Sequence, residues 1–268
     1  MTAAATFSLV RGSQPLLVSL PHAGRAIPPQ IAARLVPRAL AVEDTDWHLE
    51  RLYDFVPQLG ASLLVPHCSR YVIDLNRPPG DTPMYAGANN TGLVPLTSFS
   101  GEPLYRDGKA PGNDETRARV AAYWQPYHDA LAAELARLHR RHGFALLWDG
   151  HSIRSELPWL FAGRLPDLNL GTAAGSSCAA ALRNRLIAQI EAQVRFGHVA
   201  DGRFTGGYIT RHYGRPGQDI HAVQMEMTWS CYLDEADPAA WNEARAADAK
   251  LLLRTLLGVL LVWRPNGS

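Results

Sequence analysis

Cysteine is scarce in this chain: its 268 residues include 3 cysteines, Cys68, Cys178 and Cys231. The number is odd, and no two of them form a Cys-x-x-Cys pair. The sequence therefore indicates neither a disulfide framework nor a zinc site built from thiolates. Any metal chemistry has to come from histidine and carboxylate side chains.

An excess of charge of one sign is also absent. The 26 Lys and Arg residues nearly balance the 25 Asp and Glu residues, for a formal net charge of +1. This balance gives no reason to expect nucleic acid or an anionic membrane as a partner. Residues 1–6 lack the pattern of a signal peptide, and the longest apolar stretch, 251–263, is too short to span a bilayer. We expect a cytoplasmic monomer or small homo-oligomer that binds a small molecule.

Common phosphate-binding and nucleophile motifs are missing. The chain contains neither Gly-x-Gly-x-x-Gly nor Gly-x-x-x-x-Gly-Lys-Ser/Thr. Residues 150–154 begin like the nucleophile elbow of serine hydrolases, but Arg154 stands where that motif needs glycine. These absences argue against a nucleotide-binding loop and against a serine nucleophile at this position.

Short apolar runs alternate with longer amphipathic segments, which is typical of an α/β fold. We predict a mixed, mostly parallel sheet flanked by helices, and the lack of a clear linker favours a single domain over residues 1–268. Residues 77–112 are rich in glycine and proline and predict a lid or binding loop. The predicted strands are 16–20, 62–66, 71–75, 144–148, 159–162, 208–210 and 222–227, and the predicted helices are 29–35, 45–55, 114–142, 176–195 and 238–262.

Two histidines stand just beyond predicted buried strands, His22 after 16–20 and His151 after 144–148. A single histidine at a sheet edge is more often structural than ligating, but two at separate strand ends suit a metal site. The acidic cluster 43–50 offers a third ligand. Asp46 and Glu50 lie four apart, on one face of the predicted helix, and of the two we favour Asp46.

A His22, Asp46 and His151 set would leave a coordination position open, as in catalytic rather than structural zinc sites. Asp149, two residues before His151, could orient that imidazole. Imidazole and carboxylate ligands suit one divalent ion, with zinc favoured and cobalt, iron or manganese as alternatives.

Further polar residues could supply acid–base chemistry and anion binding. Glu226 lies within an apolar strand, where a carboxylate needs a partner, either a metal-activated water or an arginine. Arg70, Asn76, Arg77 and Arg211 lie near predicted strand ends and could bind carboxylates, although any single arginine is more often a solvated surface charge.

Taken together, these motifs resemble the N-formylglutamate amidohydrolase (N-formylglutamate deformylase) family over roughly residues 10–235. The resemblance rests on Pro21-His22-Ala23-Gly24, Asp44-Thr45-Asp46, Ser69-Arg70 to Asp74-Leu75-Asn76-Arg77, Asp149-Gly150-His151-Ser152, Gly206-Gly207 to Arg211, and Gln224-Met225-Glu226. It implies a fold like that of the zinc carboxypeptidases and of aspartoacylase (phosphorylase/hydrolase-like). The implied reaction is hydrolysis of N-formyl-L-glutamate to formate and L-glutamate, the last step of one histidine-degradation route.

The resemblance also implies roles for individual residues. His22 and His151 would bind the metal, Glu226 would be the catalytic carboxylate, and Asn76 and Arg77 would hold the substrate carboxylates with Arg70 nearby. The carboxypeptidase His-x-x-Glu pair is absent, because Arg25 follows His22 by three residues. The second ligand must come from elsewhere, with Asp46 favoured and the alternatives Asp44, Glu43 and Glu50.

Two other functions remain open from sequence. One is hydrolysis of a different N-acyl amino acid by the same metal site. The other is a non-catalytic protein that binds small dicarboxylates.

Overall fold

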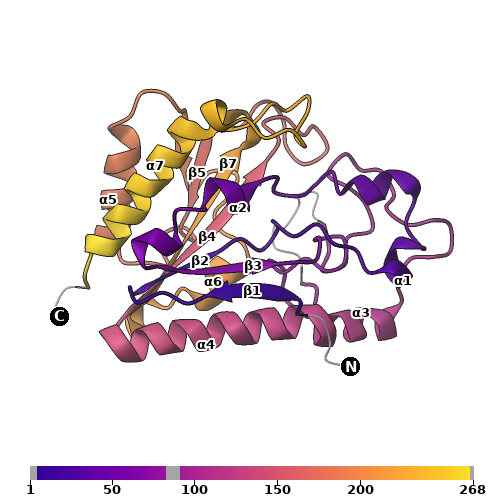
Figure 1. Ribbon diagram of the computed structural model, residues 1–268, viewed down its shortest axis with the longest axis horizontal. Helices are drawn as coiled ribbons and strands as arrows, with labels where there is room; N and C mark the ends of the chain where they lie inside the picture. Colours follow the sequence, from indigo (N-terminus) through magenta and orange to yellow (C-terminus); the bar gives the residue numbers. More distant parts are fainter. Residues whose placement is uncertain (1–4, 83–90, 266–268) are drawn as a thin grey trace.

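A seven-stranded sheet runs through the computed structural model, which describes residues 5–82 and 91–265 (Figure 1). In spatial order the strands are β1-β3-β2-β4-β7-β5-β6. Their bounds are β1 (Phe7–Val10), β2 (Leu16–Ser19), β3 (Ser62–Pro66), β4 (Ala145–Ile153), β5 (Leu168–Gly171), β6 (His198–Ala200) and β7 (Ile220–Thr228).

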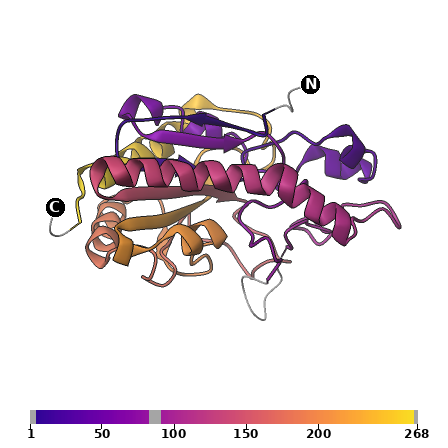
Figure 2. The ribbon, with the colours of Figure 1, turned by 90° about the horizontal axis from the view of Figure 1, so that it is seen from below.

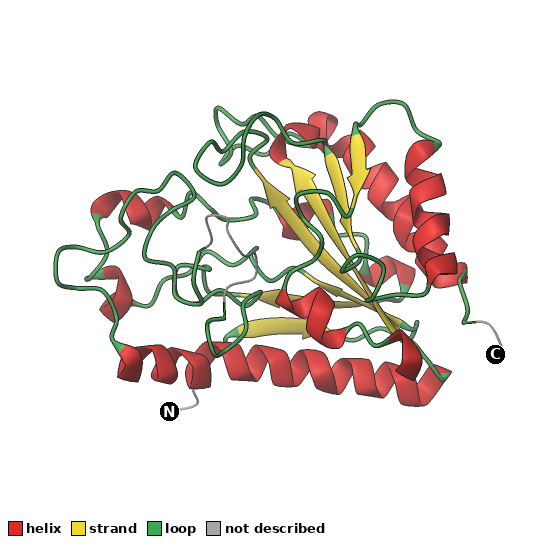
Figure 3. Ribbon diagram, turned by 180° about the vertical axis from the view of Figure 1, so that it is seen from behind, coloured by secondary structure: helices red, strands yellow, loops and turns green. Residues whose placement is uncertain are grey.

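The centre of the sheet is parallel and its margins are mixed. Strands β3, β2, β4 and β7 pair in parallel with their neighbours. Strand β1 pairs antiparallel with β3, and β5 pairs antiparallel with β7 but parallel with β6. The prediction of a mixed, mostly parallel sheet is therefore confirmed. Figure 3 shows the twist of the strands across the sheet.

Helices cover both faces of this sheet, as parallel strands with two apolar faces require (Figures 1 and 2). Leu17 of β2 packs in a cluster with α4, whereas Leu16 and Val18 pack in a cluster with α5 and α7. The helices are α1 (Pro29–Ala32), α2 (Leu49–Leu52), α3 (Asn113–Arg119), α4 (Gln125–His142), α5 (Ala180–Glu191), α6 (Tyr208–Tyr213) and α7 (Glu243–Val262).

The helix predicted over 114–142 contains a wide turn. A π-helix over Val120–Trp124 joins α3 to α4, and Figure 2 shows the three segments as one bent rod. Pro126, near the start of α4, has no N–H to donate, and its ring crowds the carbonyl of Ala122 in a regular helix. A π-turn relieves this conflict, and such turns are frequent at functional sites.

Three predicted strands are wrong. Residues 71–75 and 159–162 form turns and irregular segments, and residues 208–210 begin helix α6. Tyr71, Val72 and Leu75 are apolar because they are buried in the α4 side of the core, not because they belong to a ladder. Strands β1, β5 and β6 were not predicted, since each has only three or four residues.

The observed boundaries of β4 and α2 differ from the predicted ones in ways that affect the candidate site. Strand β4 continues to Ile153, so His151 lies inside the strand rather than beyond it. Helix α2 covers only Leu49–Leu52, so Asp46 precedes the helix instead of sharing a helical face with Glu50.

Part of the predicted loop 77–112, residues 83–90, lies outside the described residues. In the described remainder, isolated bridges join Leu35 to Tyr105 and Thr97 to Pro103. All three cysteines are free thiols, in keeping with the sequence prediction. Among the described residues, no helix combines the length and apolarity needed to cross a membrane.

Candidate active site

Three predicted ligands from distant parts of the chain meet at one end of the parallel strands. His22 follows β2, Asp46 precedes α2, and His151 lies in β4. The Nδ1 atoms of His22 and His151 are 3.1 Å apart. Asp46 Oδ2 lies 3.8 Å from Nδ1 of His22 and 3.4 Å from Nδ1 of His151. All three residues are buried.

This triangle fits a divalent metal ion. Tetrahedral ligands at about 2.0–2.2 Å from zinc are separated from one another by about 3.3–3.6 Å. The three observed separations, 3.1, 3.4 and 3.8 Å, bracket that value. Two imidazole nitrogens and a carboxylate oxygen are a donor set that zinc accepts. His22, Asp46 and His151 could therefore hold one such ion with a coordination position left for water or substrate.

A carboxylate stands behind each imidazole. Asp74 Oδ1 lies 2.7 Å from Nε2 of His22, and Asp149 Oδ1 lies 3.1 Å from Nε2 of His151. At His22 this carboxylate favours the tautomer whose Nδ1 lone pair is available to a metal. At His151, Nε2 also lies 3.1 Å from the amide nitrogen of Asn76, and Asp149 Oδ1 has no hydrogen-bond partner within the described residues. Asp149 was predicted for this position, whereas Asp74 was not.

The surroundings change the pKa values of His22 and His151 in opposite directions. Burial, helped by the charge of Arg70, lowers the pKa of His22 and favours its neutral form. Burial acts the same way on His151, but the carboxylates of Asp149 and Asp46 outweigh it and raise the pKa of His151 well above its usual value.

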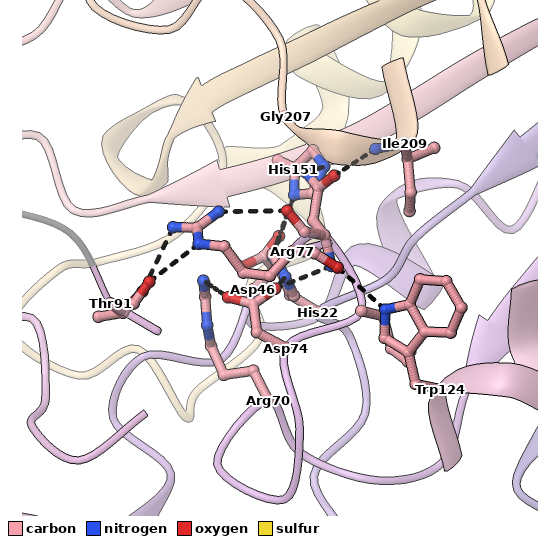
Figure 4. A network of polar contacts seen from close by, with 12 residues as sticks. His22, Asp46, Arg70, Asp74, Arg77, Thr91, Trp124, His151, Gly207 and Ile209 are labelled. Carbon is pink, nitrogen blue, oxygen red and sulfur yellow. Dashed lines mark hydrogen bonds and ion pairs between the residues drawn. The ribbon is translucent and has the colours of Figure 1, made fainter. Parts of the chain in front are cut away.

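Asp74 connects the metal-binding residues to the anion-binding candidates (Figure 4). Its Oδ2 accepts a 2.6 Å bond from Arg70, and its Oδ1 accepts a 2.8 Å bond from the backbone N–H of Asn76. Burial would raise the pKa of Asp74, yet the charges of Arg70 and His22 hold it well below its usual range. The carboxylate is therefore ionised and balances the Arg70 guanidinium.

Glu226 lies beside His151 in the sheet. The two residues are register partners on the parallel strands β7 and β4, so their side chains point to the same face about 5 Å apart at the backbone. Burial is the main reason that the pKa of Glu226 rises to about 8. In the described part of the chain its carboxylate has neither an ion pair nor a hydrogen bond, so the predicted alternative of an arginine partner is not observed. A carboxyl of this kind can exchange a proton near neutral pH.

These groups share one cavity. It is lined by His22, Asp46, Arg70, Asn76, Arg77, Thr91, Phe99, His151, Ser152, Ile153, Leu160, Arg203, Phe204, Gly207, Gln224 and Glu226. Seven of the eight predicted site residues are in this lining. Most of the lining is polar or charged, which suits a small polar ligand rather than an apolar one.

Asn76 and Arg77 are held at the cavity by backbone contacts. Asn76 Oδ1 accepts a 2.8 Å bond from the N–H of Ile209, at the start of α6. The Arg77 guanidinium donates to the carbonyl of Thr91 at 2.9 Å and to that of Asn76 at 3.2 Å (Figure 4). In the described part of the chain, Arg77 has no ion pair, so its charge is available to an anion.

Gly207 is glycine because Asn76 lies against it. A Cβ at this position would come within 2.3 Å of Asn76 Nδ2 and 2.6 Å of its Oδ1. Gly207→Ala should displace the amide and lower kcat/KM by about 100-fold, as misplacement by about 1 Å can do. Gly217→Ala is the matched control, since nothing lies within 4 Å of a Cβ there. Equal activity of the two variants would contradict this close-packing argument.

Arg211 is the predicted residue that the structure does not bring into the cavity. Its guanidinium donates to the carbonyl of Gly206 at 2.8 Å and to Thr205 at 2.7 Å, outside the lining. The prediction treated 208–210 as a strand with Arg211 at its end, but this segment is helix α6, which turns the side chain toward Thr205.

Arg203, in the loop before α6, lines the cavity and was not predicted. Its sequence signal, a place near the Gly206-Gly207 pair, is shared by Arg211 and so does not single it out.

The alternative carboxylates near Asp46 have other partners or positions. Glu43 pairs with Arg38 at 2.8 Å, and Asp44 accepts a 2.9 Å bond from the N–H of Phe99. Glu50 lies on α2 and is absent from the cavity lining. Within the described residues, Asp46 is the acidic residue grouped with both histidines.

Comparison with known proteins identifies the family of this chain. A family model for N-formylglutamate amidohydrolase matches residues 14–233. The chain is 53% identical over 256 residues to N-formylglutamate deformylase from Pseudomonas aeruginosa, and 48% identical over 256 residues to that from Pseudomonas putida. Each match covers 96% of this chain and 96% of the relative.

Solved structures show the same architecture. The crystal structure of N-formylglutamate amidohydrolase from Ralstonia eutropha JMP134 matches with a TM-score of 0.80 and 25% identity, over 96% of this chain and 98% of that one. A crystal structure from Agrobacterium tumefaciens, 18% identical, shares the fold with a TM-score of 0.70, over 95% of this chain and 96% of that one. The family match spans most of the sequence and the relatives match along nearly their whole length. This chain therefore belongs to the N-formylglutamate amidohydrolase family.

Proposed function

We propose that this protein hydrolyses N-formyl-L-glutamate to formate and L-glutamate, using one zinc ion held by His22, Asp46 and His151. The observation that carries the proposal is the shared cavity, in which these three ligand atoms lie beside Glu226 and three arginines. The names of the family and of its curated relatives supply the substrate.

The residues of the cavity have different roles in amide hydrolysis. When bound, a divalent ion supplies a Lewis acid that activates water and polarises the formyl oxygen. Glu226 takes the proton of the attacking water and delivers it to the leaving nitrogen as the C–N bond breaks. Asp74 keeps the imidazole of His22 oriented, and Asn76, with the nearby carboxylate of Asp149, contacts Nε2 of His151. Phe99, Leu160 and Phe204 limit the access of bulk water.

The arginines and Asn76 position the substrate. Arg77 and Asn76 bind one carboxylate of the glutamate moiety, and Arg203 binds the other. Arg70 is already balanced by Asp74, but its buried Nε has no hydrogen-bond partner in the described part of the chain. We assign this N–H to a substrate oxygen. Binding both carboxylates holds the small formyl group over the metal ligands.

Removal of the metal tests the proposed function. We expect the purified protein to release formate from N-formyl-L-glutamate, to lose this activity on treatment with a chelator, and to regain it when zinc is added back. Metal analysis should give about one ion per chain. A preparation with bound zinc that hydrolyses N-acetyl or N-succinyl amino acids better than N-formylglutamate would identify another N-acyl amino acid as the substrate. Binding of dicarboxylates without any hydrolysis would indicate a non-catalytic protein.

Arg77→Ala should weaken the handling of dicarboxylate substrates. Loss of a charged hydrogen-bond donor costs about 1.5–3 kcal/mol, so kcat/KM for N-formylglutamate should fall by about 10- to 100-fold. Thermal stability should change little, because among the described residues the guanidinium bonds to backbone and hydroxyl oxygens alone. Arg211→Ala is the control, since that guanidinium lies outside the cavity lining. The assignment would be wrong if the two variants had the same steady-state constants.

A further inference from the structure

The segment 69–77 carries much of the proposed site yet has no regular secondary structure. It contains Asp74, Asn76 and Arg77, and it runs through turns between β3 and the loop that follows. Buried carbonyl groups that are not paired in a ladder need other donors. The carbonyls of Leu75 and Arg77 flank Asn76, so whatever binds them sets the position of both anion-binding side chains.

Two side chains of the bent helix bind these carbonyls. Trp124, the last residue of the π-helix, donates its indole N–H to the carbonyl of Arg77 at 2.9 Å (Figure 4). His128, one turn later on α4, contacts the carbonyl of Leu75 through Nε2 at 2.9 Å. A carbonyl can only accept, so Nε2 carries the proton, and Nδ1 accepts from the hydroxyl of Tyr213 at 3.0 Å.

The side-chain rings of Trp124 and His128 stack on each other. Their centroids are 3.8 Å apart with planes inclined by 25°, and both side chains are buried. Trp124 and His128 are four residues apart at the start of α4, so both rings lie on one face of the helix, next to the segment.

The opposite side of Asn76 is held by α6. The backbone N–H of Ile209 donates to Asn76 Oδ1 at 2.8 Å, and Gly207 permits that approach. Tyr213, at the end of α6, contacts His128. The Asn76–Arg77 pair is thus enclosed between α6 and the Trp124–His128 ring pair, and neither ring appears in the lining of the cavity.

We propose that Trp124 and His128 are positioning residues, which hold Asn76 and Arg77 in the geometry that binds the substrate carboxylate. The role of Asn76 and Arg77 rests on the proposed function. Neither ring touches substrate. Each binds a backbone carbonyl next to Asn76. A small displacement of these carbonyls would move the side chains of Asn76 and Arg77 away from the substrate carboxylate.

The first test compares Trp124→Phe with Trp241→Phe. Phenylalanine keeps an aromatic ring for stacking on His128 but has no N–H for Arg77. The control also loses one indole hydrogen bond, a 2.8 Å bond to Glu243, and neither residue lines the cavity. We expect Trp124→Phe to raise KM for N-formylglutamate on the order of tenfold, as the loss of one buried hydrogen bond can, with a smaller change in kcat and unchanged zinc content. Trp241→Phe should retain wild-type constants.

A second pair of variants distinguishes loss of the hydrogen-bond donor of His128 from loss of stability. His128→Leu removes the donor to Leu75, whereas His128→Gln offers an amide N–H that can reach the same carbonyl. We expect the leucine variant to raise KM and the glutamine variant to recover part of the loss. Melting temperatures of all variants identify any that merely unfold.

Amide hydrogen exchange supplies a readout that does not depend on activity. The N–H groups of Val72, Asp74 and Asn76 are hydrogen-bonded within or next to the segment, so their exchange reports its order. Trp124→Phe should exchange faster here than wild type or Trp241→Phe. Faster exchange with an unchanged KM would indicate a purely structural role and overturn the proposal, as would equal exchange in the two tryptophan variants. If wild type does not hydrolyse N-formylglutamate, the proposed function fails, and the exchange comparison alone decides whether Trp124 positions the segment.

Discussion

Replacing Glu226 with glutamine is expected to lower kcat for N-formylglutamate by about 10²- to 10⁴-fold, the usual contribution of a positioned acid–base group. Glutamine has nearly the same shape but cannot accept the proton of the attacking water. In the described part of the chain the carboxylate makes no ion pair whose loss would disturb the fold. Zinc content and melting temperature should therefore stay close to those of wild type. The measurements are formate release under saturating substrate, metal analysis and thermal unfolding.

A buried glutamate outside the cavity provides the control. Glu134 is buried on α4, where it bonds to Ser62 and Arg137. Glu134→Gln removes a buried carboxyl group as Glu226→Gln does, so it should affect stability while leaving kcat near the wild-type value. If Glu226→Gln retained wild-type kcat, the proton would have to pass through another group, and the mechanism proposed above would be wrong.

The central parallel strands could be predicted because each is buried on both faces. The runs 16–20, 62–66 and 222–227 are mostly apolar and correspond to β2, β3 and β7. The outer strands β1 and β6 have four and three residues and partly exposed side chains, so local composition carries little information about them. The segment 71–75 misled the prediction for a different reason. Its apolar side chains reflect packing against α4 and not a hydrogen-bonded ladder.

The ligand set was predictable to the extent that its residues lie near strand ends. His22 and His151 stood out beside buried runs, and β2 and β4 are adjacent in the sheet, which brings the two imidazoles together. Asp46 and Glu50 were named together as candidates because of a shared helical face that does not exist, since α2 begins only at Leu49. The candidate survives in the structure because the backbone N–H of Asp46 bonds to the carbonyl of His22 at 3.1 Å, a tertiary contact that no local pattern reveals.

Residues that act through the tertiary structure were invisible in the sequence. Asp74 contacts His22 across 52 positions of the chain, and Trp124 contacts Arg77 across 47. Arg203 and Arg211 are both arginines near Gly206-Gly207, and their local patterns do not distinguish them. The loop conformation places Arg203 at the cavity, whereas the start of α6 turns Arg211 toward Thr205.

Asp46→Asn should weaken zinc binding more than any change elsewhere in the acidic cluster. The Ser152 N–H donates to Asp46 Oδ2 at 3.1 Å, and an asparagine oxygen can accept the same bond, so the fold should persist. The amide oxygen carries no full negative charge, and the site would then have two imidazoles and no anionic ligand to hold a dication. Changes to groups that merely support a ligand cost 10- to 100-fold in metal affinity, so loss of the anionic ligand should cost about 100-fold or more.

The matched comparison is Glu50→Gln, which removes one carboxylate from the same cluster four residues away. Glu50 is half-buried on α2 and does not line the cavity. The Glu50→Gln variant should therefore bind zinc with the affinity of wild type. Titration of chelated protein with zinc, followed by formate release, measures both quantities in one preparation. If the two variants bound zinc equally well, a different oxygen would complete the site. If Glu50→Gln alone lost zinc, the ligand would be Glu50, which would require α2 to rotate from the position seen here. The present distances of 3.4 and 3.8 Å from Asp46 Oδ2 to the two imidazoles favour Asp46.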